Sequence, residues 1–146
     1  MANQIPYETT IHVRDHCLCL AAQRAARALA RRFDEAFRHL GITSGQYSLL
    51  MALNRPAPPP LGPVAELLAM DRTTLTANLK PLVRRGLVKI IQNPADKRSR
   101  LLKLTDAGHE LLLQAVPIWK SEHAAIDAEI EALQPDVLRK GLSALA

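Results

Sequence analysis

The sequence predicts a mostly α-helical protein that carries one small two-stranded β-hairpin. Hydrophobic residues make up 48% of the 146 positions but aromatic residues only 3%. Leu, Ala, Val and Ile must therefore fill the core, and Ala and Leu are strong helix formers. Apolar residues recur every three or four positions along most of the chain, and every second position only between residues 87 and 104. The length is that of one domain with helical extensions.

The first element is a long helix, expected from about Thr10 to His39. Its apolar residues recur in steps of three and four from Cys19 to Leu40, which is the spacing of one helix face. A helix of about thirty residues spans about 45 Å, more than a domain of this size covers with its own core. Part of this helix is therefore expected to pack on another subunit. Gly41 follows at a typical helix end.

The middle of the chain contains signals for three shorter helices. Capping side chains or a first-turn proline mark where each begins, and a glycine marks where the last one ends. The proline-rich segment 55–60 lies after the first of them and cannot be helical, because proline lacks the backbone N–H. The expected helices run from Thr43 or Ser44 to Leu53, from Pro63 to Ala69, and from Arg72, capped by Asp71, to Arg85 before Gly86.

A hairpin and two further helices complete the chain. The hairpin is expected because the apolar period changes to two after Gly86. Pro117 lies inside the helix that follows and is expected to kink it. The expected strands are Leu87–Ile91 and Arg100–Leu104, joined by a turn at Asn93–Asp96. The first helix is expected to be capped by Thr105 and to end at about Glu131, and the second to run from Pro135 to Leu145.

Charge is distributed unevenly along the chain. The formal net charge is +5, but residues 72–100 hold eight basic side chains against one acidic side chain, Asp96. Residues 121–146 hold five acidic side chains against two basic ones. An excess of Lys and Arg confined to one region is the electrostatic footprint of a nucleic-acid partner.

The order helix, helix, short link, helix and hairpin is that of a winged helix-turn-helix, and Arg72–Arg85 is its candidate recognition helix. Leu75, Leu79, Leu82 and Val83 are expected to hold one side of this helix to the core. The other side carries short polar groups and cations suited to base edges in the major groove, and cations at the hairpin tip suit phosphates or the minor groove. The candidate DNA contacts are Arg72, Thr73, Thr74, Thr76, Asn78, Lys80, Lys97, Arg98 and Arg100.

Four stretches resemble the MarR family of regulators: residues 67–76 (LLAMDRTTLT), 85–88 (RGLV), 93–99 (NPADKRS) and 104–108 (LTDAG). The resemblance implies a homodimer that binds a near-palindromic double-stranded DNA operator as a repressor. It implies that the wing arginine, Arg98, enters the minor groove with Asp96 orienting it. It also implies a DNA-binding lobe at 41–105 between dimerisation helices at 1–40 and 106–146.

Within that family, residues 15–21 are similar to the start of the organic-hydroperoxide-sensing branch, the OhrR type. In that branch a reactive cysteine follows a Leu near the start of the first helix, and Cys19 occupies this place. The branch supports its thiolate with tyrosine hydroxyls. The positions that align with those tyrosines hold Gln23, Phe33 and Ser44.

The cysteines also have a structural interpretation. Cys19 lies on the same predicted helix face as Ala22, Ala26 and Leu29, and buried cysteine packs as a small hydrophobic residue. Cys17 points to another side of that helix, so a disulfide between the two is not expected. A redox role for Cys19 or Cys17 and a packing role both remain open at this stage.

A bound small molecule is the other candidate input. The expected ligand is aromatic or anionic and lies between the long helices and the winged lobe, near His12, His16, Arg27 and Trp119. The five histidines do not have the spacing of a metal site, and no cofactor is expected. An enzyme is not expected, because the chain lacks a nucleophile–base arrangement and a glycine-rich phosphate loop. A winged helix used for protein contact would carry an apolar recognition face, whereas this one is polar.

The expected location is the cytoplasm, without a membrane partner. Two cysteines make no disulfide framework. The N-terminus has neither a basic flank nor the unbroken apolar run of a signal peptide.

Overall fold

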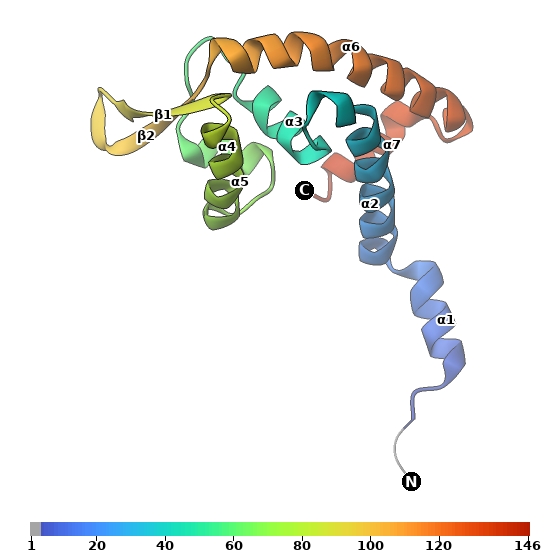
Figure 1. The fold of residues 1–146 in the computed structure, drawn as a ribbon. Helices are drawn as coiled ribbons and strands as arrows, with labels where there is room; N and C mark the ends of the chain where they lie inside the picture. Colours follow the sequence, from blue (N-terminus) through green and yellow to red (C-terminus); the bar gives the residue numbers. More distant parts are fainter. Residues whose placement is uncertain (1–3) are drawn as a thin grey trace.

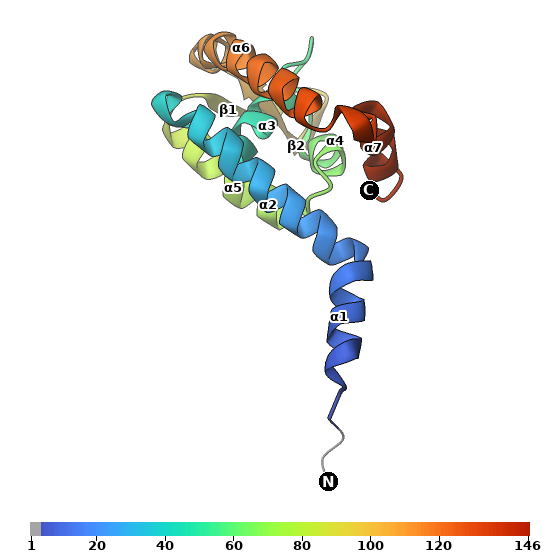
Figure 2. The same cartoon turned by 90° about the vertical axis from the view of Figure 1, so that its right-hand side faces the viewer.

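The computed structural model describes residues 4–146 and confirms a mostly helical fold with a two-stranded antiparallel wing. The elements are α1 Tyr7–His16, α2 Leu18–Ala36, the 3-10 turn η1 Arg38–Leu40, α3 Ser44–Ala52, α4 Leu61–Leu67, α5 Arg72–Arg84, β1 Val88–Asn93, β2 Asp96–Leu104, α6 Asp106–Glu129, the 3-10 turn η2 Glu131–Leu133, and α7 Pro135–Ser143. Helix α6 continues through Pro117. Helix α6 spans one side of the molecule, and α4, α5 and the wing form a lobe at one end (Figure 1). Helix α1 extends away from this body (Figure 2).

The predicted continuous helix from Thr10 to His39 is wrong, because two helices meet at Cys17. Cys17 has an extended backbone (φ −77°, ψ 108°), and its Sγ accepts a hydrogen bond from the N–H of Leu20 at 3.4 Å, which caps α2. The apolar spacing that predicted the helix begins only at Cys19. Helix α1 buries none of its residues, so no packing within one chain favours a single straight helix.

Three helices start at the capping side chains that the sequence predicts. Thr43 and Gln46 form a capping box at α3, in which each side chain accepts a hydrogen bond from the backbone N–H of the other residue, at 3.2 and 3.0 Å. Asp71 caps α5 and Thr105 caps α6. Gly86 follows α5 with a φ of +71°, a conformation that glycine adopts without strain.

The wing is longer than predicted and is anchored at its base. β2 begins at Asp96 rather than at Arg100, with a bulge in the ladder near the tip. The N–H of Leu102 donates to the carbonyl of Pro59 at 2.8 Å. The proline-rich loop therefore lies along the outer edge of β2 and fixes the direction in which the wing leaves the lobe.

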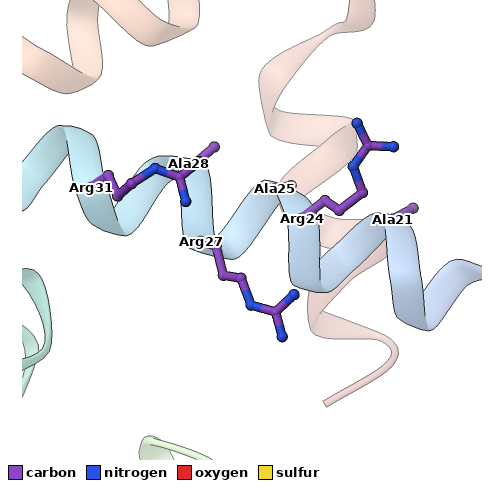
Figure 3. A pocket seen from close by; sticks show the side chains of 6 residues that line it. All are labelled: Ala21, Arg24, Ala25, Arg27, Ala28 and Arg31. Carbon is purple, nitrogen blue, oxygen red and sulfur yellow. The ribbon is translucent and has the colours of Figure 1, made fainter.

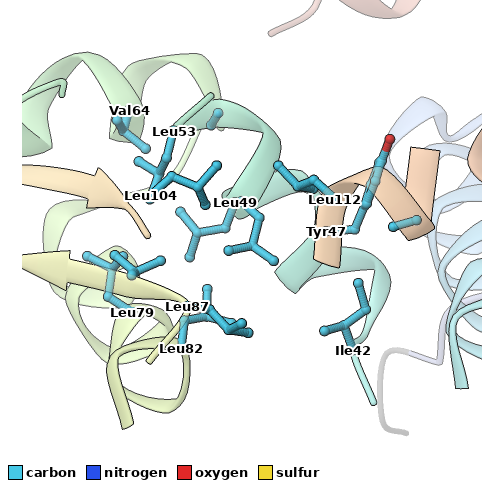
Figure 4. Packing of buried hydrophobic residues seen from close by; sticks show 14 of the residues in the cluster. Ile42, Tyr47, Leu49, Leu53, Val64, Leu79, Leu82, Leu87, Leu104 and Leu112 are labelled. Atoms are coloured by element: carbon cyan, nitrogen blue, oxygen red, sulfur yellow. The ribbon is translucent and has the colours of Figure 1, made fainter. Parts of the chain in front are cut away.

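One apolar core supports α5 and the base of the wing (Figure 4). Its members come from α2 to α6 and from both strands of the wing. Leu75, Leu79 and Leu82 are buried as predicted, at 0%, 2% and 0% exposure. The prediction for Val83 is wrong: its side chain is 37% exposed. Val83 and the exposed Ile90 of β1 both line one open pocket at the surface.

Ion pairs neutralise part of the acidic C-terminal region. Arg32 of α2 donates to Glu122 and Glu129 of α6, each at 2.8 Å, and Arg139 of α7 donates to Asp127 at 2.9 Å. The apolar side chains of the chain ends are not covered in the same way. Those exposed within residues 4–40 and 106–146 are Ile5, Tyr7, Val13, Leu18, Leu29, Leu113, Trp119, Leu133, Val137, Leu138, Leu142 and Leu145.

Candidate nucleic-acid interface

Helix α5 has a buried apolar side and an exposed polar side. The buried leucines recur at steps of four and three, so they form one stripe that fixes the helix to the core. Every predicted contact on the other side is exposed, and none takes part in the core. These exposed residues are Arg72, Thr73, Thr74, Thr76, Asn78 and Lys80.

Two of the threonine hydroxyls also hold the helix together. The carboxylate of Asp71 accepts the N–H of Thr74 at 2.7 Å and its hydroxyl at 2.8 Å. These hydrogen bonds, the backbone one first, lower the pKa of Asp71 below its usual value. The hydroxyl of Thr76 donates to the carbonyl of Arg72 at 2.8 Å. Thr74 and Thr76 can therefore still accept hydrogen bonds from a base, whereas the hydroxyl proton of Thr73 has no such partner among the described residues.

The wing presents its cations from a tip that is ordered by side chains. Lys97, Arg98 and Arg100 are all exposed. Asp96 accepts the backbone N–H of Arg98 at 3.0 Å, and Asn93 accepts that of Ala95 at 3.0 Å. Asp96 thus orders the backbone at Arg98, and the ion pairs found within residues 4–146 do not include one between these two side chains.

The cations of this region form no ion pair with the acidic side chains of residues 4–146. The ion pairs found within residues 4–146 use Arg14, Arg32, Arg38 and Arg139, and none of the eight basic residues between positions 72 and 100. Arg85 instead donates to the carbonyl of Gly41 at 2.6 Å. The recognition helix and wing therefore present uncompensated positive charge to solvent, which is the arrangement that attracts phosphates.

The chain matches known proteins across this lobe. Residues 40–99 match the family model described as the MarR family. The organic hydroperoxide resistance transcriptional regulator of Bacillus subtilis (strain 168) is 31% identical over 101 residues, which cover 69% of this chain and 69% of that protein. The chain belongs to the MarR family. Two further relatives, the regulators TtmR of Methylorubrum extorquens and BadR of Rhodopseudomonas palustris, are matched over 50% and 52% of their length.

Solved transcription regulators bound to DNA share this fold over most of the chain. The M. tuberculosis transcriptional regulator MosR in complex with DNA has a TM-score of 0.76 and 32% identity, over 88% of this chain and 96% of that chain. A MarR mutant from E. coli complexed with operator DNA has a TM-score of 0.80 and 25% identity, over 91% and 96% of the two chains. The MarR-family chain is therefore a DNA-binding transcription regulator and not an enzyme.

The cysteines of this MarR-family chain lie at the junction of α1 and α2. Cys19 is exposed rather than packed on the core, and Leu29 on the same face is 42% exposed. The Nε2 of Gln23 donates to the Sγ of Cys19 at 3.4 Å. Phe33 lies in the core and Ser44 at the start of α3, so within one chain only Gln23 of the three aligned positions contacts this thiol. Cys17 is half-buried as the cap of α2.

The four predicted ligand-pocket residues lie in three separate places. His12 and His16 stack on each other on α1, with ring centroids 4.1 Å apart. Arg27 is an exposed residue of α2 between Arg24 and Arg31 in the chain, and its side chain points away from that of Arg24 (Figure 3). Trp119 lies on α6, where its ring meets that of His123 at an angle of 45°, with centroids 4.4 Å apart. A single chain therefore does not bring them together.

Trp119 does line an apolar pocket, of about 460 Å³, between α3, α4 and α6. Tyr47, Met51 and Leu67 contribute its walls, and Lys120 lies at its edge. Burial raises the pKa of Tyr47. The sequence pattern did not indicate these other residues, although the scarcity of aromatic residues could have drawn attention to Tyr47.

Within residues 4–146, His, Cys, Asp and Glu side chains do not form a group of three that could hold a metal ion. Among the same residues, none of the helices is both long enough and apolar enough to cross a membrane.

Proposed function

We propose that this chain is a homodimeric repressor that binds a near-palindromic DNA operator through α5 and the wing, and that a small molecule modulates this binding. The observation that carries the proposal is the row of exposed polar and cationic side chains on α5, continued by the cations of the wing, none of which forms an ion pair within the part of the chain that the structure describes. A dimer would place two such surfaces on successive major grooves, about 34 Å apart. The solved MosR and MarR complexes with DNA support this assignment.

DNA binding is tested with a duplex selected in vitro from a random-sequence pool. The native protein should enrich a near-palindrome and bind it with a steep dependence on salt, because cations on α5 and the wing displace counterions from phosphates. Arg98→Ala should weaken binding without lowering the melting temperature. Arg38→Ala is the matched control, because Arg38 is exposed outside the lobe and pairs with Glu35. Affinity that hardly changes with salt would overturn the proposal.

The dimer is inferred from the exposed apolar side chains of the chain ends. Residues 1–40 and 106–146 form the proposed dimerisation region, and residues 41–105 form the DNA-binding lobe. Deleting the segment after Gln134 should give a monomer in sedimentation, because it removes the exposed apolar face of α7. Leu142→Glu should act in the same direction, with Lys140→Glu as the control on the same helix. A truncated chain that stays dimeric at micromolar concentration contradicts this interface.

The pocket beside Trp119 is the proposed effector site. Its volume suits a small aromatic molecule, and the ammonium group of Lys120 at its edge suits a carboxylate. Trp119 is the only tryptophan in the chain, so its fluorescence reports occupancy directly. Benzoate should quench this fluorescence and release DNA over the same concentration range. DNA affinity that stays constant while Trp119 is fully quenched would separate this pocket from regulation.

A second candidate input is oxidation of Cys19, which the exposed position of its thiol favours. A Cys19 thiolate would attack the terminal oxygen of an organic hydroperoxide, so that the S–O bond of a sulfenic acid forms, the O–O bond breaks, and the leaving alkoxide takes a proton from water to become the alcohol. The B. subtilis relative is named for organic hydroperoxide resistance. Hydroperoxide should release DNA from the native protein and from Cys17→Ser, but not from Cys19→Ser. Equal release from all three, or from none, would assign Cys19 to structure alone.

A further inference from the structure

Three arginine side chains line one pocket between α5, β2 and the start of α4. Arg72 from α5 and Arg98 and Arg100 from β2 line an open pocket of about 390 Å³. The rest of its lining is Pro60, Leu61, Gly62, Pro63 and Ser99, so it includes no acidic side chain. The fold thus brings together three cations that lie up to 28 positions apart in the chain (100 − 72).

Arg72 points towards this pocket and not along the exposed face of α5. A Cβ built on Gly62 would lie 2.9 Å from Nη2 and 3.7 Å from Cζ of Arg72. The guanidinium therefore lies against the bare Cα of Gly62, on α4. Arg100 is also held in place, because its Nη1 donates to the carbonyl of Lys97 at 3.3 Å.

Among the ion pairs found within residues 4–146, none joins the nearby carboxylates Asp71 and Asp96 to these arginines. Asp71 is occupied by the N–H and hydroxyl of Thr74, and Asp96 by the N–H of Arg98. Like charges held close together repel each other unless an anion joins them. A guanidinium is planar and donates two parallel hydrogen bonds to phosphate oxygens, so several of them favour a phosphate over a monatomic anion.

We propose that Arg72 and Arg100, with Arg98 beside them, bind one backbone phosphate of duplex DNA. This inference rests on the proposed DNA binding and deepens it. Arg72 then positions the protein on the DNA backbone, and base reading begins at Thr73. Arg98 is also the residue that the family resemblance assigns to the minor groove, so the pair Arg72 and Arg100 carries the proposal. One phosphate held from both α5 and β2 fixes the register of the recognition helix and the wing together.

The test uses the in vitro selected duplex. Arg72→Gln and Arg100→Gln should each weaken binding about tenfold, and each should reduce the slope of log K against log salt by about 1. The double variant should lose less than the product of the two single losses, because both side chains hold the same phosphate. Base substitutions in the duplex should weaken the native protein and Arg72→Gln by the same factors, since a phosphate contact carries no sequence information.

Gly62→Ala tests the geometry without removing a charge. The added methyl group would displace the far end of the Arg72 side chain, so binding should weaken several-fold. Helical Ala is favoured over Gly, so the melting temperature should stay the same or rise. Gly45→Ala is the control, because its Cβ meets only Thr43 Oγ1 at 3.9 Å, an ordinary contact.

The outcomes separate this inference from the proposed function. If Arg98→Ala weakens binding but Arg72→Gln and Gly62→Ala bind as tightly as the native protein, the phosphate site is wrong and the DNA interface stands. If Arg72→Gln relaxes the preference for one base with an unchanged salt slope, Arg72 reads that base and the phosphate site is also wrong. A native protein without salt-dependent DNA binding would overturn both.

Discussion

Gly108→Ala is expected to destabilise the protein, although Ala is favoured over Gly in helices. Gly108 lies in the first turn of α6, where Ala would ordinarily stabilise a helix by about 1 kcal/mol relative to Gly. A Cβ at Gly108, however, would lie 2.7 Å from Cδ1 of Leu104 and closer still to the carbonyl oxygen of Leu87. That carbonyl cannot move freely, because it accepts the N–H of Thr105 at 3.1 Å. Helix α6 approaches the base of the wing this closely only because position 108 has no side chain.

The cost of Gly108→Ala follows from these contacts. Forcing a methyl group into a packed site costs about 1–3 kcal/mol, and loosening the Thr105–Leu87 hydrogen bond adds about 1 kcal/mol. After the gain in helix propensity, we expect a net loss of about 1–3 kcal/mol. For a chain of this length that lowers the melting temperature by roughly 3–12 °C.

Thermal and urea unfolding followed by circular dichroism, at one fixed protein concentration, measure this loss. Gly45→Ala is the control, because it makes the same chemical change in the first turn of α3 without a close contact. It should leave stability unchanged or raise it by up to about 1 kcal/mol. A Gly108→Ala protein at least as stable as the native one would refute the close approach of α6 to the wing.

The wing and the aromatic cluster give two further predictions. Leu102→Ala should lower the free energy of unfolding in urea by about 2–5 kcal/mol, because Leu102 is 1% exposed. Its cross-strand partner Ile90 is 44% exposed, so Ile90→Ala should lower it by less than about 1 kcal/mol. Equal losses would contradict the burial of Leu102. Burial between Phe33 and Trp119 lowers the pKa of His123 in the folded protein. Its contribution to stability is therefore present at a pH above the ordinary histidine pKa of about 6.5 and is lost as the pH falls through the lower folded-state pKa. Melting is measured at about pH 7.5 and about pH 5.5, on either side of this ordinary pKa of about 6.5. The drop in melting temperature between them should be smaller in His123→Gln than in the native protein, and an equal drop would show that His123 does not cause it.

Local chemistry explains which helix limits could be predicted from the sequence. Thr43, Asp71 and Thr105 are capping residue types, and each caps the helix expected of it. The break at Cys17 had no such signal, because cysteine is not a typical cap and the residues after it are strong helix formers. The early start of β2 at Asp96 lies beyond the alternating pattern, among polar residues whose pairing depends on the bulge and not on burial.

The candidate site could likewise be predicted from the sequence only in part. The exposed positions of α5 follow from the leucine stripe, since helix periodicity alone separates the two sides. The direction of Arg72 does not follow from it, because the position of its guanidinium depends on Gly62 in a different helix. The apolar pocket beside Trp119 likewise combines three helices that only tertiary packing brings together.

The proline-rich loop also affects how the wing meets other molecules. An exposed strand edge offers unpaired N–H and C=O groups to which a strand of another chain can add. Here the N–H of Leu102 on the outer edge of β2 is already taken by the carbonyl of Pro59. Pro58, Pro59 and Pro60 have no backbone N–H of their own, so the loop covers the edge without offering a donor from these residues to a further strand. The segment therefore protects the base of the hairpin against edge-to-edge aggregation and leaves the cationic tip free.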